Sequence, residues 1–171
     1  MPTTRVREAR LADVPAIVAL VRDLAEYEKE PDAVEATEEH FIAALFPDEP
    51  DSARSHALVA ETLGSGGEAT VVGMAVWYVT FSTWTGRHGI WLEDLFVRPE
   101  HRGSGLGTAL LARLAAIAVD RGYRRLEWWV LRWNEPSIEF YDALGATPMD
   151  EWLHYRVDGP PLQRLAARDH R

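Results

Sequence analysis

The sequence contains no cysteine among its 171 residues. Disulfide bonds, a thiolate nucleophile and a metal site built on thiolates are therefore excluded. The six histidines, among them His40, His56 and His88, show no metal-ligand spacing, and no catalytic triad order of serine, histidine and aspartate is identifiable. We expect no metal cofactor.

Long hydrophobic runs are also absent. The most apolar segment, residues 106–119, is shorter than the roughly 18 residues that a membrane span needs, and it contains Arg113. The first ten residues carry three arginines and no apolar stretch, which is unlike a signal peptide. We expect a cytoplasmic protein with no membrane partner.

Basic residues are scarce relative to acidic ones. The chain has 18 lysines and arginines against 27 aspartates and glutamates, a formal net charge of −9. This field repels a polyanion, so we expect no nucleic-acid partner. Residues 26–39 hold seven acids and a single base, Lys29. Such a run is usually a solvated face, but beside a cleft it would concentrate a cationic substrate.

The length and the 47% apolar content are typical of one globular unit, and we predict a single domain over residues 1–171. Hydrophobic periodicity predicts helices that begin after Asp13, near Thr37 and at Leu106, and a short helix at 138–144 after a polar turn at 134–137. Alternating and apolar runs predict strands at 4–9, 56–61, 70–81, 90–97, 126–131 and 153–157. The fold class is α/β (α+β), with a mixed, mostly antiparallel central sheet flanked by helices.

A glycine-rich loop separates the strand at 90–97 from the helix that begins at Leu106. It reads Arg102-Gly103-Ser104-Gly105-Leu106-Gly107. Free backbone amides and the positive end of the helix dipole meet there, which favours binding of a phosphate. The spacing matches neither a Walker loop nor the dinucleotide fingerprint, and a plain tight turn is the alternative.

Two adjacent acids, Glu93 and Asp94, interrupt an otherwise apolar strand. Adjacent strand residues point to opposite faces, so whichever face is buried should receive a carboxylate. Burial raises the pKa of a carboxyl group, as a general base for an amine requires. A solvated edge strand or a structural ion pair with an arginine is the alternative.

A polar turn and a nearby phenol form the third feature. Asn134-Glu135-Pro136-Ser137 is suited to cap a short helix, on which Tyr141 lies at helical spacing. Tyr141 is either a core residue or a proton donor, since a phenol with a pKa near 10 suits a leaving thiolate.

Together these segments resemble the GNAT superfamily of N-acetyltransferases, and within it the diamine (spermidine/spermine) and thialysine acetyltransferase branch. The resemblance extends over residues 6–157 and also includes Leu24-Ala25-Glu26-Tyr27-Glu28-Lys29. Its most specific motifs are Leu92-Glu93-Asp94-Leu95-Phe96-Val97, Arg102-x-x-Gly105-x-Gly107 and Asn134-Glu135-Pro136-Ser137-Ile138-x-Phe140-Tyr141.

The resemblance implies the GNAT acetyltransferase fold, acetyl-CoA as acetyl donor, a small amine as substrate and a homodimer. It implies Glu93 as the base, directly or through a water, and Tyr141 as proton donor to the CoA thiolate. Contacts to the donor would come from Leu95, Phe96, Val97, Arg102, Gly103, Ser104, Gly105, Leu106, Gly107, Thr108, Asn134, Glu135, Pro136 and Ser137. The amine site would be lined by Tyr27, Glu28, Trp84, Asp94, Glu127, Trp128, Trp129 and Glu151.

The substrate is less constrained than the reaction. Ser82 and Thr83 precede Trp84 where polyamine enzymes of the branch carry an acid and a proline, as in the thialysine type, whereas residues 134–137 resemble the polyamine type. We expect direct transfer to a primary amine of a small aliphatic (di)amine or a lysine-like substrate. The alternatives are an acetyltransferase for protein lysines or N-termini, a non-catalytic CoA-binding regulatory module and a nucleotide-binding domain.

Overall fold

A five-stranded sheet in the order β1-β2-β3-β4-β5 forms the centre of the computed structural model, which describes residues 3–169. The strands are β1 (Thr3–Glu8), β2 (His56–Leu63), β3 (Ala69–Ser82), β4 (Arg87–Val97) and β5 (Leu126–Glu127). Neighbours from β1 to β4 are antiparallel, whereas β5 runs parallel to β4. The mixed, mostly antiparallel sheet predicted from the sequence is confirmed.

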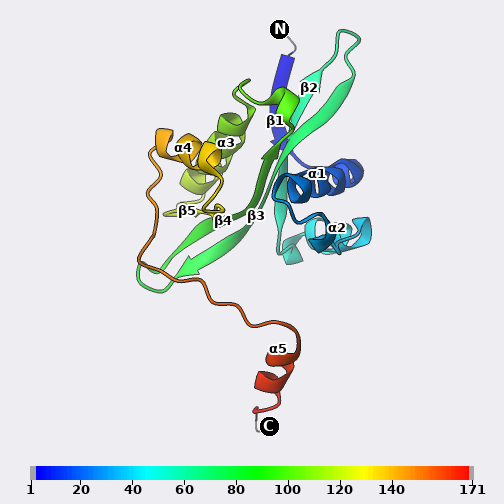
Figure 1. Cartoon of the computed structure of the whole chain (residues 1–171). Helices are drawn as coiled ribbons and strands as arrows, with labels where there is room; N and C mark the ends of the chain where they lie inside the picture. The colour runs from blue at the N-terminus through cyan, green and yellow to red at the C-terminus, as the bar shows by residue number, and fades with distance from the viewer. Residues whose placement is uncertain (1–2, 170–171) are drawn as a thin grey trace. The chain divides into compact units, whose positions relative to one another are not determined.

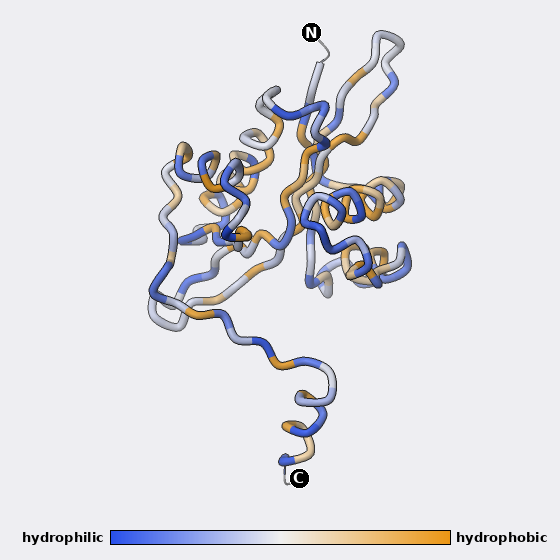
Figure 2. The backbone as a smooth tube through the Cα atoms, in the orientation of Figure 1, coloured by the Kyte–Doolittle hydropathy of each residue, from blue (hydrophilic) through white to orange (hydrophobic). Residues whose placement is uncertain are grey.

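Helices cover both faces of this sheet. In Figure 1, α1 (Val14–Tyr27) and α2 (Glu38–Leu45) lie on one face, and α3 (Leu106–Asp120) lies on the other. Figure 2 shows the central strands as a largely hydrophobic layer between helices that alternate in hydropathy. Ile17 and Leu20 of α1 are fully buried and belong to the same core cluster as Met74, Val76 and Phe96 of the sheet. The face of the sheet that carries Val76 is therefore the α1 face.

Helix α1 begins at Val14, and Asp13 occupies its N-cap position as predicted, but the Asp13 side chain does not cap the helix. Its carboxylate instead accepts hydrogen bonds from Arg7 at 2.6 and 2.9 Å and from the Arg10 amide at 2.7 Å. Arg7 also pairs with Glu61, which is 2% exposed. The aspartate thus serves a buried ion-pair network that joins β1, β2 and the start of α1.

Strand β5 is shorter than the predicted strand at 126–131, because only Ile90↔Leu126 and Trp91↔Glu127 pair. A bulge in β4 lies immediately beyond these pairs, and bulges bend a strand and end its pairing. Among residues 3–169, no strand pairs with 92–97 on that side of β4. This part of β4 presents an open backbone edge.

The chain is divided into two compact units, Met1–Trp129 and Val130–Arg171. The single-domain organisation stays a prediction. The second unit contains α4 (Glu135–Ala143) and α5 (Gly159–Ala166). No helix within residues 3–169 combines the length and apolar character that crossing a bilayer requires.

The strand predicted at 153–157 is wrong. These residues have no regular secondary structure, and Leu153 and Tyr155 are 74% and 84% exposed. Alternating apolar residues form a strand only where a partner strand satisfies their backbone groups, and none pairs with them among residues 3–169. The helix α5 that follows was not predicted, and two prolines occupy its first turn.

Candidate active site

The central feature of the site is a β-bulge in β4. Val76 lies opposite Asp94, but the next residue of β3, Trp77, lies opposite Leu92, so Glu93 is the extra residue. Beyond the bulge, Tyr78 lies opposite Trp91. Since Val76 and Tyr78 are two residues apart on one strand, their partners Asp94 and Trp91 share the α1 face of the sheet.

This bulge corrects the expectation that Glu93 and Asp94 point to opposite faces. An added residue interrupts strict alternation, so both carboxylates approach the same side. Glu93 accepts a hydrogen bond from Trp91 on that face and lies close enough to Asp94 to raise its pKa. The sequence pattern could not reveal this, because alternation assumes a regular strand.

Asp94 is the half-buried carboxylate of the pair, whereas Glu93 is exposed. Burial, followed by the nearby charges of Glu93 and Glu28, raises its pKa to about 6. Glu28 follows the last residue of α1, and burial raises its pKa as well. Three predicted residues, from β4 and from the end of α1, therefore form one acidic cluster, which we call the carboxylate cluster.

Glu93 itself is exposed, and its carboxylate is held from one side. The indole Nε1 of Trp91 donates a hydrogen bond to Glu93 Oε2 at 3.1 Å. The Trp91 ring contacts two other rings, that of Tyr78 at 6.4 Å and that of Trp129, edge-on, at 4.7 Å. Burial, and then the charge of Glu93, raises the pKa of Tyr78. Trp91 and Tyr78 were missed, although the two-residue spacing from Trp91 to Glu93 was a usable signal.

The glycine loop ends at the N-terminus of α3, as predicted. Gly103 and Gly105 have φ angles of 73° and 85°, and a Cβ built on either would meet nothing within 4 Å. Gly105 is the N-cap residue, and its carbonyl accepts the first helical bond, from Ala109. The amides just before Ala109 therefore have no partner within the helix, and open space surrounds the loop glycines. This arrangement fits an anion such as a diphosphate.

The Arg102 side chain turns back from this loop toward α1 and β4. Its Nε donates to the Val97 carbonyl at 2.9 Å. Its guanidinium lies over the ring of Tyr27 at 4.6 Å and over that of Phe96 at 5.4 Å. A cavity of about 570 Å³ adjoins these rings and is lined by Asp23, Glu26, Tyr27, Phe96, Arg98, Pro99 and Glu100. Because the Arg102 side chain is turned away, binding of an anion at the loop depends on the backbone amides. The neighbouring cavity is lined by more acidic than basic residues.

The other predicted residues of the first unit lie in varied settings. Trp84 is in the turn between β3 and β4 and is 87% exposed. Glu127 pairs with Arg125 at 2.6 Å, and Trp128 is half-buried. Within residues 3–169, no group of three or more acidic or histidine side chains is arranged to hold a metal ion.

The predicted residues of the second unit lie on or near α4. Asn134 is buried at the N-cap position, and Glu135, Pro136 and Ser137 form the first turn. Tyr141 is half-buried on the same helix, with its ring 5.3 Å from that of Phe140. The polar turn predicted at 134–137 is therefore the start of the helix. Glu151 is exposed in the segment that follows.

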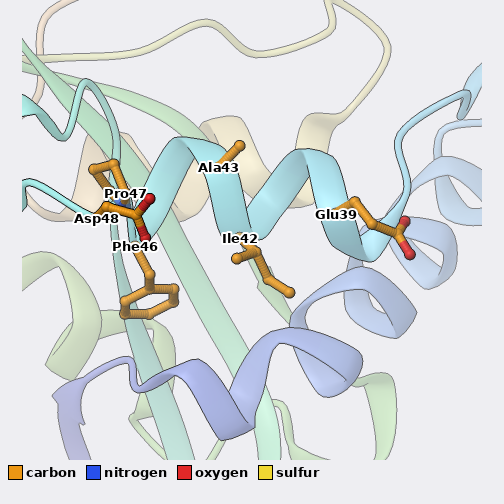
Figure 3. Close-up of a pocket in the computed structure, with 6 residues that line it drawn as sticks. All are labelled: Glu39, Ile42, Ala43, Phe46, Pro47 and Asp48. Carbon is orange, nitrogen blue, oxygen red and sulfur yellow. The ribbon is translucent and has the colours of Figure 1, made fainter.

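A second cavity, of about 380 Å³, contains none of the predicted residues. Helix α2 and the turn after it line this cavity, and Figure 3 shows Ile42 and Phe46 on the same side of the helix. Its acidic residues, Glu39 and Asp48, lie at opposite ends of the labelled set in Figure 3. Nothing in this cavity resembles the carboxylate cluster.

Comparison with known proteins gives a consistent result. Residues 18–146 match the model of the acetyltransferase (GNAT) family. A thialysine N-epsilon-acetyltransferase of Mus musculus is 38% identical over 98% of this chain and 100% of its own length, and that of Bos taurus is 40% identical over the same shares. A spermidine/spermine N(1)-acetyltransferase-like protein of Homo sapiens is 32% identical over 95% of this chain and 24% of its own.

Solved structures give the same fold. An integron cassette protein from V. cholerae has a TM-score of 0.74 at 24% identity, covering 95% of this chain and 97% of its own. An aminoglycoside acetyltransferase from an uncultured soil metagenomic sample, in complex with trehalose, has a TM-score of 0.72 at 16% identity, covering 91% and 95%. At these identities the likeness concerns the fold alone.

Proposed function

Since this chain belongs to the acetyltransferase (GNAT) family and is an acetyl-transferring enzyme, we propose that it transfers the acetyl group of acetyl-CoA to the primary amine of a small aliphatic (di)amine or a lysine-like substrate. The observation that carries this proposal is the carboxylate cluster of Glu28, Glu93 and Asp94. Clustered carboxylates attract an ammonium group and can take its proton.

The donor site is formed by backbone groups. Acetyl-CoA is the acyl donor of GNAT acetyltransferases. The amides of residues 102–108 would hold its diphosphate at the N-terminus of α3, and the open edge of β4 at Leu95–Val97 would pair with its pantetheine arm. Asn134, Glu135, Pro136 and Ser137, at the start of α4, would complete the donor site.

The reaction is a direct attack. A primary ammonium loses a proton to Glu93, directly or through a water, and its nitrogen attacks the thioester carbonyl carbon. A strand amide of β4 stabilises the developing oxyanion. The carbon–sulfur bond then breaks, and the Tyr141 phenol gives its proton to the departing thiolate. The nitrogen loses its second proton, which returns the tyrosine to the phenol, and Glu93 releases the first proton to solvent. Asp94 and Glu28 hold the ammonium in place by charge.

The proposed class of amine substrate rests on two observations, the acidic residues that line the cavity and the similarity to thialysine acetyltransferases. Three carboxylates and Arg98 line the cavity beside Tyr27, and Arg98 pairs with Asp23 at 3.0 Å. Glu26 and Glu100 still give the cavity an excess of negative charge, which suits a cationic substrate. The thialysine relatives of Mus musculus and Bos taurus align with 98% of this chain, so a lysine-like amine is the first candidate. A homodimer and a cytoplasmic location stay predictions.

Two measurements test this function. Isothermal titration calorimetry with acetyl-CoA tests the donor site, and absence of binding would remove the proposal. A thiol-release assay with thialysine, lysine, putrescine, spermidine and a basic peptide tests the substrate class. Turnover of the peptide alone would favour a protein acetyltransferase, and binding of acetyl-CoA without turnover of any amine would favour a regulatory module.

A further inference from the structure

Trp91 contributes a single polar atom, Nε1, and this atom is directed at the proposed base. The indole N–H donates to Glu93 Oε2 at 3.1 Å, from two residues earlier on the same strand. Trp91 is half-buried, whereas Glu93 is exposed. An exposed glutamate ordinarily samples several rotamers, so a fixed donor on its own strand restricts where its carboxylate lies.

The Trp91 ring is itself held. Trp129 stands edge-on to it, and the ring of Tyr78 lies on the neighbouring strand. The backbone of Trp91 pairs with Glu127 of β5, the last ladder pair before β4 opens. The donor therefore belongs to a residue that is paired on both sides within the sheet, and the acceptor belongs to the bulge.

We propose that Trp91 is a positioning residue, whose indole N–H fixes the Glu93 carboxylate so that Oε1 is presented to the substrate ammonium. This inference rests on the proposed function, because it assumes Glu93 as the base. With Oε2 occupied by the indole, Oε1 is the oxygen that accepts the proton. The bond formed is Oε1–H, the bond broken is an ammonium N–H, and its electron pair stays on the attacking nitrogen.

Two substitutions separate the N–H group from the ring. Trp91→Phe keeps an aromatic ring beside those of Tyr78 and Trp129 but removes the donor. Trp91→Gln removes the ring but places an N–H the same number of bonds from the backbone as the indole Nε1. We expect about tenfold lower kcat for Trp91→Phe, with KM for both substrates nearly unchanged, and a smaller loss for Trp91→Gln. A larger loss for Trp91→Gln would overturn the proposal, because it would assign the effect to ring packing.

The pH profile is the second measurement. The charge of Glu93 acts on Asp94 of β4 and on Tyr78 of β3. The other titratable groups packed around this part of β4 are Glu28 at the end of α1, which acts on Asp94, and the Arg125–Glu127 pair on and beside β5, where Glu127 pairs with Trp91. Loss of the indole donor disfavours the charged carboxylate, so the acid limb of kcat/KM should move to higher pH in Trp91→Phe. An unmoved limb would contradict the proposal. Trp133→Phe is the matched control and should change neither the limb nor kcat.

A double-mutant cycle identifies the partner. In a Glu93→Gln background, Trp91→Phe should cause little further loss, because the base that it positions is gone. Full additivity would overturn the proposal. Wild-type activity of Glu93→Gln alone would also overturn it, and would show that the proposed base, not the positioning role, is at fault.

A spectroscopic readout is independent of activity. The chain has seven tryptophans, each with one indole N–H resonance in a two-dimensional ¹H–¹⁵N NMR spectrum. The resonance that disappears in Trp91→Phe belongs to Trp91. That resonance should move upfield in Glu93→Ala, when its charged acceptor is removed. An unchanged resonance would show that the hydrogen bond does not form in solution, and would contradict the positioning role even if Glu93 is the base.

Discussion

Asp94 lies opposite Val76 across β3 and β4, on the face of the sheet that α1 covers. Phe96, two residues further along β4, belongs to the core cluster on the same face, and burial together with the charges of Glu93 and Glu28 raises the pKa of Asp94 to about 6. Regular alternation with Phe96 thus places a partly desolvated carboxylate on the α1 face. Burial of this charged carboxylate is unfavourable for folding, and it lies where the proposed amine would bind.

This relationship predicts that Asp94→Asn stabilises the protein while it weakens the amine site. Because the folded-state pKa is raised above the ordinary value of 3.8, the folded state binds more protons, and its stability falls as pH rises from about 4 to about 6. The penalty at neutral pH is about 3 kcal/mol at most. The variant should therefore exceed wild type in free energy of unfolding by about 1–3 kcal/mol at pH 7.5, and by nearly nothing at pH 4.

Urea unfolding of both proteins between pH 4 and pH 8 provides the measurement. The difference between them should grow with pH, while KM for the amine increases in the variant. A stability difference that is the same at every pH would show that the aspartate is not desolvated.

A second prediction concerns the ion-pair network of Arg7, Glu61 and Asp13. Hydrogen bonds from Arg7 are the largest cause that lowers the pKa of both carboxyl groups. Their contribution to stability is therefore complete above the ordinary carboxyl range and is lost as pH falls through the lowered values. We expect Glu61→Gln to cost about 3 kcal/mol, since it removes one of the two buried carboxylates that pair with Arg7, and to weaken the dependence of stability on pH below about 4.

The control for this variant is Arg113→Gln, which removes an exposed pair with Glu8 at 3.8 Å. Exposed pairs of this kind contribute at most about 1 kcal/mol. Denaturant unfolding at pH 7 and pH 3 should separate the two variants, and equal losses would contradict a special role for the network.

The sequence could predict those features that depend on local pattern. The periodicity of α1 and α3, the glycine loop and the positions of strands β1 to β4 all follow from residues close together in the chain. The ion pair of Arg7 with Glu61 was not foreseen, because it joins residues 54 positions apart. The bulge at Glu93 depends on the register between β3 and β4, and its one local sign was the pair of acids within an apolar run.

A third prediction tests the proposed proton donor. Tyr141→Phe removes the phenol and keeps the ring beside Phe140, so the fold of α4 should be preserved. We expect kcat to fall about 100-fold, as is typical for loss of a general acid, with acetyl-CoA affinity changed by less than about threefold. Steady-state kinetics and calorimetry measure the two quantities. Tyr155→Phe, at a side chain that is 84% exposed, is the matched control, and equal effects of the two variants would remove Tyr141 from this role.

The last prediction concerns the two ends of α3. Gly105 at the N-cap and Gly122 after the C-terminus have φ angles of 85° and 68°, and a Cβ on either would meet nothing within 4 Å. Alanine at either position should therefore cost a similar amount, about 1 kcal/mol, through backbone strain alone. Only Gly105 lies where a diphosphate would approach the free amides. Gly105→Ala should weaken acetyl-CoA binding about tenfold or more in calorimetry, whereas Gly122→Ala should leave it unchanged. Equal affinities in the two variants would show that the phosphates of the donor bind away from the N-terminus of α3.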